Sequence, residues 1–91
     1  MPKVHRVDNL YGEGKGGWVF HCPACTWSHG PADTWQFNGD VEKPTFKPSI
    51  LVRHPNRVEI CHSFVTDGKI QYLNDCTHEL AGKTVDLPEW E

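Results

Sequence analysis

The sequence has no apolar segment that approaches the roughly 20 residues a membrane-spanning helix needs. Its first ten residues, MPKVHRVDNL, contain charges but no apolar run of signal length. Internal repeats and low-complexity tracts are also absent from the sequence. We therefore expect a protein of the cytoplasm, where thiols stay reduced, so that paired cysteines favour metal binding or redox chemistry over structural disulfides.

Hydrophobic residues are not abundant either. They make up 37% of a 91-residue chain, and this length is near the lower end of what a hydrophobic core stabilises alone. The four cysteines and six histidines can supply the missing stabilisation as metal bonds. The sequence thus predicts one domain, residues 1–91, that is held together by zinc.

Long helices are excluded by the density of turn signals. Seven prolines interrupt the chain, and Asn38-Gly39 and Asp67-Gly68 are pairs typical of hairpin turns. The segments between such signals are short and rich in β-branched and aromatic residues, which favours strands. They are GWVFHC, DTWQFNG, SILVRH, RVEICHSFV, KIQYLND and KTVDL. We expect an all-β or β-rich domain of about six or seven short antiparallel strands, similar to an irregular zinc ribbon.

One short helical turn is predicted over residues 76–81. Asp75 is placed to cap its first turn with its side chain, and Gly82 is placed to end it. Because the segment is so short, it adds one local turn to a fold that otherwise consists of hairpins.

The hairpin around Asp67-Gly68 has two possible registers. A two-residue turn puts Cys61 and Cys76 on the same face of the hairpin, where both can reach one ion. A three-residue loop shifts the pairing by one residue and buries Phe64 on the same face as His62 and Cys76. The apolar pattern favours the three-residue loop, whereas metal binding through both cysteines favours the two-residue turn.

The segment FHCPACTWSH carries the clearest chemical signal. Cys22 and Cys25 are separated by two residues after an apolar strand, a spacing that lets both sulfurs bind one ion from a single tight turn. A redox pair is the alternative, but such pairs stand at the start of a helix, and the glycine and proline that follow here indicate none. His29 can add a third ligand from the same loop.

A structural zinc site needs four ligands, so the others must come from the second half of the chain. Cys61 and Cys76 are the preferred thiolates, followed by His78, His29 and His62. A second, open site built from His62, Asp75, Cys76 and His78 is an alternative, and so is a pair of buried cysteines without metal. The candidate metal ligands are therefore Cys22, Cys25, Cys61, Cys76, His78, His29 and His62.

Charge is distributed unevenly along the chain. The net charge is −3, and the acidic residues dominate after residue 57. Between residues 43 and 57 lies a stretch with four basic residues and no carboxylate, which can bind a partner or simply keep an edge strand soluble. Those candidate partner-binding residues are Lys43, Lys47, Arg53 and Arg57. The overall negative charge disfavours nucleic acid as the partner, because phosphate contacts dominate such affinity.

Several sequence blocks occur together in order: CPACTWSH, WQFNGD, PTFKPSI, CHSF, DCTHELAG and LPEW. With these blocks the chain resembles a small zinc-binding protein family of unknown function that is encoded by phages and prophages, some of whose members are mislabelled as ammonia monooxygenase. The resemblance implies a phage or prophage origin and hence the host cytoplasm as the location. A chain of this length without membrane spans gives the monooxygenase label no support.

Three functions remain as alternatives. The favoured one is a non-enzymatic zinc-binding module that binds a protein of the bacterial host or phage, with counter-defence inhibition as one such role. The second is a nucleic-acid-binding zinc protein. The third is a small zinc- or thiol-dependent hydrolase, in which Cys76 is the nucleophile, His78 or His62 the base, and Asp75 the group that orients the base.

Overall fold

The structure is a computed structural model that describes residues 2–25, 28–53 and 60–90, and within these ranges it contains strands and turns but no helix. This confirms the all-β prediction. The strands are β1 (His5–Val7), β2 (Gly17–His21), β3 (Ser28–His29), β4 (Gln36–Phe37), β5 (Phe46–Arg53), β6 (Ile60–Thr66), β7 (Lys69–Tyr72) and β8 (Thr84–Asp86).

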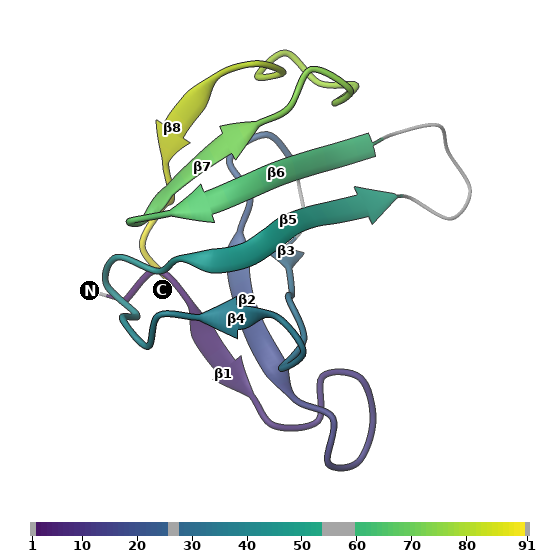
Figure 1. Cartoon of the computed structure of the whole chain (residues 1–91), viewed down its shortest axis with the longest axis vertical. Coiled ribbons are helices and arrows are strands. Elements are labelled where there is room, and N and C mark those ends of the chain that lie inside the picture. The colour runs from purple at the N-terminus through teal and green to yellow at the C-terminus, as the bar shows by residue number, and fades with distance from the viewer. Residues whose placement is uncertain (1, 26–27, 54–59, 91) are drawn as a thin grey trace.

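The strands form two antiparallel sheets. The smaller sheet has the order β1-β2-β3, and the larger one has the order β4-β5-β6-β7-β8. In Figure 1 β2 runs steeply behind β4 toward β5, and β1 lies beside β2 below the larger sheet. One face of the larger sheet therefore packs on the core, while its other face, which we call the outer face, is turned to solvent.

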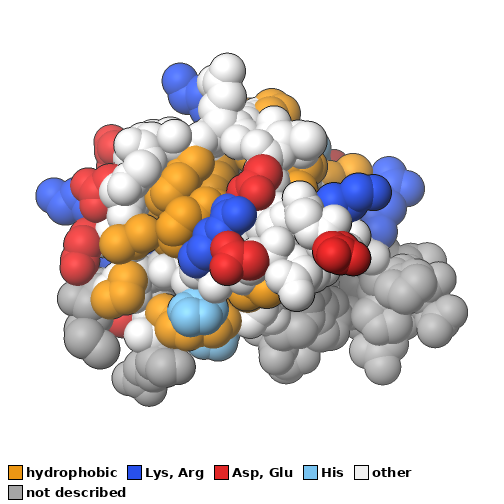
Figure 2. All heavy atoms as spheres, turned by 90° about the horizontal axis from the view of Figure 1, so that it is seen from below, with side chains coloured by type: hydrophobic (Ala, Val, Ile, Leu, Met, Phe, Trp, Pro, Cys, Tyr) orange, Lys and Arg blue, Asp and Glu red, His pale blue; other side chains and the backbone are white. Residues whose placement is uncertain are grey.

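The buried residues form one core between the two sheets. Phe20 comes from the smaller sheet, and Ile50, Val65 and Ile70 come from the larger one. In β6 the buried residues Cys61, Ser63 and Val65 alternate with half-buried or exposed ones, as expected for a strand with one face on the core. Acidic and basic side chains are interspersed around a group of hydrophobic ones on the side seen in Figure 2.

The hairpin between β6 and β7 has the two-residue turn. Val65 pairs with Ile70, and the two turn residues, Asp67 and Gly68, have φ values of 50° and 78°. Positive φ at both positions is the signature of a type I′ turn, which Asp-Gly favours. The apolar pattern, which favoured the three-residue loop, therefore indicated the wrong register. It failed because Phe64 lies on the outer face and is 40% exposed.

The helical turn predicted over residues 76–81 is also wrong, since this segment forms consecutive turns. The amide of Thr77 donates to the carbonyl of Ile60 at 3.0 Å, and the amide of Gly82 donates to that of Tyr72 at 3.1 Å. These amides bind the neighbouring strands, so they are not available for bonds within a helix. A helix of this length would also have left most of its terminal groups without partners.

The described part of the chain contains no helix with the length and the apolar character that crossing a membrane requires.

Candidate metal centre and candidate active site

Three separate segments bring four candidate ligands together in the core. The tight turn after β2 holds Cys22 and Cys25, with the Cys25 amide donating to the Cys22 carbonyl at 3.3 Å. Strand β3 supplies His29, whose partner in β2 is Phe20, and β6 supplies Cys61. The ligand atoms of Cys22, Cys25, His29 and Cys61 all lie within 4.8 Å of one another, so this group can hold a metal ion.

The distances in this group fit a tetrahedral zinc site. The sulfurs of Cys22 and Cys61 are 3.8 Å apart, and His29 Nε2 is 3.3 Å from Cys61 Sγ. With zinc–sulfur bonds of about 2.3 Å, two sulfurs of a tetrahedron lie about 3.8 Å apart. His29 is 2% exposed, and its Nδ1 has no hydrogen-bond partner among the described residues. Among the described residues, the polar contacts of the His29 ring are thus made by Nε2, with the cysteine sulfurs.

The thiols of this group strongly influence one another. Hydrogen bonding to Cys61 lowers the pKa of Cys22 to about 3, and the Tyr72 hydroxyl, 3.1 Å from Cys22 Sγ, also favours the thiolate. Burial raises the pKa of Cys25 to about 12. The hydrogen bond with Cys22, followed by burial, raises the pKa of Cys61. By themselves these sulfurs therefore favour a single negative charge, whereas a cation among them would stabilise three.

A second group, made of Cys61, Cys76 and His78, also has its ligand atoms within 4.8 Å of one another. His78 fits a metal poorly, because its Nδ1 accepts a hydrogen bond from the Leu80 amide at 3.2 Å. In the neutral ring the proton must then sit on Nε2, the buried nitrogen that would have to bind the ion. Cys76 Sγ is also engaged, at 3.1 Å from both the amide and the carbonyl of His62.

His62 belongs to neither group, since it points to the outer face of β6 rather than to the core. Its Nδ1 lies 3.0 Å from Asp75 Oδ2, and its Nε2 lies 2.9 Å from Ser49 Oγ. A carboxylate accepts the proton of Nδ1, which leaves Nε2 as the acceptor of the serine hydroxyl. Ser49, His62 and Asp75 thus form a serine–imidazole–carboxylate triad with the connectivity that nucleophilic hydrolases use.

An irregularity in β5 aims Ser49 at the imidazole. Phe46 pairs with Val65 and Ile50 pairs with Ser63, so residues 47–49 of β5 bulge opposite Phe64. Bulges re-aim side chains and are frequent next to active sites. The bulge contains the cis peptide bond between Lys47 and Pro48, and the indole of Trp35 donates to the Ser49 carbonyl at 3.3 Å.

The remaining members of the triad come from the neighbouring strands. His62 is opposite Leu51 in the β5–β6 ladder, and its carbonyl accepts the amide of Leu73 at 2.9 Å. The chain turns directly after β7, so Asp75 reaches back to the imidazole. The side chains of His62 and Asp75 are 24% and 54% exposed, which leaves the triad open to a substrate.

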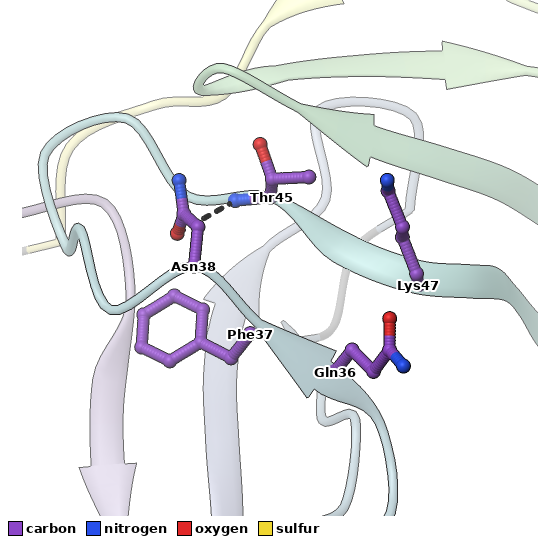
Figure 3. A pocket seen from close by; sticks show the side chains of 5 residues that line it. All are labelled: Gln36, Phe37, Asn38, Thr45 and Lys47. Carbon is purple, nitrogen blue, oxygen red and sulfur yellow. Dashed lines mark hydrogen bonds between the residues drawn. The ribbon is translucent and has the colours of Figure 1, made fainter.

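Of the predicted partner-binding residues that the structure describes, Lys43 lies in the β4–β5 loop, and Lys47 and Arg53 lie in β5. Lys43, Lys47 and Arg53 are exposed, whereas Arg57 and His54 lie outside the described residues. Lys47 also lines a shallow cavity of about 210 Å³ beside β4 and β5, together with Gln36, Phe37, Asn38 and Thr45 (Figure 3). The cavity contains no residue of the triad. Binding of a partner by the basic residues stays a prediction.

The sequence alone did not indicate Ser49 as a functional residue, although it did indicate its two partners, His62 and Asp75. His62 and Asp75 were considered as a base and its orienting group, with Cys76 as the nucleophile. A signal did exist, because all three triad residues fall within the blocks PTFKPSI, CHSF and DCTHELAG, which come from separate parts of the chain. A serine in such a block has no spacing rule comparable to that of two cysteines in CPAC.

Comparison with known proteins identifies the family. A family model described as "bacterial ubiquitination-like system serine protease (BubE)" matches residues 1–73, a range that includes the four-residue Cys/His group, Ser49 and His62 and ends just before Asp75. Searches of curated proteins and of solved structures gave no match. The phage origin and the host cytoplasm stay predictions, since the family description names a bacterial system. Because the match covers most of the chain, the chain belongs to the BubE family.

Proposed function

We propose that this chain is a serine peptidase of a bacterial ubiquitination-like system, with Ser49 as the nucleophile. The observation that carries the proposal is the continuous hydrogen-bonded array Ser49 Oγ–His62 Nε2–His62 Nδ1–Asp75 Oδ2 on a solvent-facing sheet, with steps of 2.9 and 3.0 Å. The family description supports the same conclusion. The hydrolase alternative is thereby favoured over the binding module, with Ser49 in place of Cys76 as the nucleophile.

The triad supplies each proton transfer of peptide hydrolysis. Ser49 Oγ attacks the substrate carbonyl carbon while its proton moves to His62 Nε2. Asp75 holds the ring in the orientation that this transfer needs and stabilises the imidazolium. The imidazolium then protonates the leaving amine, which gives an ester on Ser49, and water activated by His62 hydrolyses that ester.

Zinc has a structural role in this proposal. The four residues Cys22, Cys25, His29 and Cys61 would fill a tetrahedral coordination sphere without an open position, as structural sites do. Bound zinc would supply no chemistry to the reaction and would connect the β2–β3 loop to β6. The triad residues face the opposite side of β6, so the peptide bond is cleaved by the side chains of this chain alone.

The test is covalent labelling of the native, zinc-loaded protein with a fluorophosphonate, a reagent for activated serines. We expect one phosphonyl group per chain, located on Ser49 by peptide mapping. Ser49→Ala should abolish labelling and lower the turnover of an activated ester by at least about 10³-fold, because removing a triad member leaves only residual catalysis.

The matched control is Ser63→Ala on the same hairpin. Ser63 is fully buried, and its hydroxyl has no hydrogen-bond partner among the described residues. This variant should be labelled and should turn over ester like the wild type. A phosphonyl group on another residue, or an unchanged turnover in Ser49→Ala, would refute the proposed function.

A further inference from the structure

Two large hydrophobic side chains are exposed beside the triad. Leu51 is 46% exposed and Phe64 is 40% exposed, and together with Tyr11 they are the exposed large hydrophobic residues of the described chain. Tyr11 lies in the loop before β2, whereas Leu51 and Phe64 both belong to the strands that carry Ser49 and His62. Exposed apolar groups are therefore concentrated where the chemistry is proposed to occur.

The strand register places both side chains next to the reacting groups. Leu51 is directly opposite His62, and Phe64 follows His62 by two residues on the same face of β6. Leu51 and Phe64 are therefore diagonal neighbours across the β5–β6 ladder, and such neighbours lie about 7–8 Å apart. The bulge with Ser49 faces Phe64, so the serine hydroxyl is flanked by Leu51 along β5 and by Phe64 across the ladder.

The row that contains Phe64 has polar, uncharged side chains, whereas charged ones stand around it: the exposed Lys47 lies in the bulge opposite Phe64, and Arg53 follows Leu51 by two residues in β5. Phe64 pairs with Gln71, which pairs with Thr84. The next row, Thr66, Lys69 and Asp86, contains an ion pair in which Lys69 Nζ and Asp86 Oδ1 are 2.8 Å apart. The apolar surface is thus small and bounded by polar side chains, as in surfaces that bind one side chain of a ligand.

We propose that Leu51 and Phe64 select the substrate by binding an uncharged apolar side chain on the acyl side of the scissile bond of a peptide. This inference rests on the proposed function. The acyl part stays bonded to Ser49 Oγ in the ester intermediate, and both side chains neighbour Ser49 itself. A side chain next to the acyl carbonyl is therefore held over these two residues through both halves of the reaction.

The test compares the p-nitrophenyl esters of N-acetylglycine and N-acetylleucine, which differ in one apolar side chain. For the zinc-loaded wild type we expect kcat/KM for the leucyl ester to exceed that for the glycyl ester at least about tenfold, the range that apolar pockets provide. In the double variant Leu51→Gln and Phe64→Gln the preference should fall below about threefold, while fluorophosphonate labelling of Ser49 continues. Thr66→Gln, farther along the same face of β6, is the control and should keep the preference.

The possible failures are distinguishable. A wild type that turned over both esters without preferring the leucyl ester, or a double variant that kept the preference, would overturn this inference and leave the proposed function standing. Dimerisation of the wild type that the double variant abolishes would also overturn it, because the two side chains would then serve an interface between copies. A wild type with neither turnover nor labelling would refute the proposed function and this inference together.

Discussion

The two faces of β6 differ in almost every chemical respect, although the residues that define them are consecutive. Cys61 points into the core, is 4% exposed and lies among sulfurs and an imidazole. His62 points to the outer face and lies between a hydroxyl and a carboxylate. Because side chains of a strand alternate between its faces, one dipeptide serves both centres without competition between them.

The comparison shows how a chain of this size can combine a stable site with an exposed one. The inner site can hold a metal ion, whose bonds would replace part of a small hydrophobic core. The proposed active site on the outer face has to admit a substrate and therefore contributes little buried surface. The first should determine stability and the second activity, and each of the following predictions tests that division.

Removal of the metal should have the largest effect. Zinc-binding peptides of small domains fold only with their metal, with apparent binding free energies of about 10–16 kcal/mol. We expect chelation to unfold the protein and to abolish fluorophosphonate labelling at the same time, as measured by circular dichroism and mass spectrometry. A metal-free protein that stayed folded would break the division between the two faces.

The choice of ligands has its own matched pair of variants. Cys61→Ser should lose the metal, whereas Cys76→Ser should retain one metal per chain, since Cys76 lies outside the group with the better geometry. Metal content and the absorption spectrum of the cobalt-substituted protein measure this directly. Loss of metal in Cys76→Ser would favour the second group.

The orienting carboxylate should matter for activity alone. Asp75→Asn would present an amide donor to Nδ1 and so favour the wrong tautomer of His62, which should lower kcat by about 10²–10⁴-fold. The melting temperature and the metal content should stay unchanged. Asp67→Asn is the matched control, because its position in the type I′ turn tolerates asparagine and should leave kcat unchanged.

The smallest effect is expected at a pair that belongs to neither face. Arg6 Nη2 donates to Asp33 Oδ2 at 2.9 Å, and this contact holds the pKa of Asp33 below its usual value. A carboxyl group whose pKa is lowered by folding stabilises the protein above its unfolded pKa, and the contribution is lost as the pH falls through the folded pKa. Thermal melts should thus show a small difference between the wild type and Asp33→Asn at pH 7, which begins to shrink as the pH falls below about 4, with no change in kcat at pH 7.

Local patterns made the β class and the Cys22–Cys25 half of the candidate metal site predictable from the sequence. The spacing of Cys22 and Cys25 and the turn pair Asp67-Gly68 act over a few residues. The proposed nucleophile was not predictable in this way, because Ser49 meets His62 through a bulge in β5 and a pairing of separate strands. Likewise, His29 joins Cys61 through the approach of the two sheets.

The exposed Phe64 also explains why the apolar pattern favoured the register that the structure does not have. The pattern argument assumes that a large aromatic residue seeks the core. Here Ser63 occupies the buried position and Phe64 the exposed one, an inversion that folding alone does not favour. Such inversions are expected at functional surfaces, and this one lies beside Ser49.

The most direct test of the central claim is intact-mass analysis of the native protein after reaction with a fluorophosphonate, under conditions that retain bound metal. We predict one species with one zinc ion and one phosphonyl group per chain, the latter on Ser49. A folded chain with a full complement of zinc and an unmodified Ser49 would contradict the assignment of the outer face as the active site.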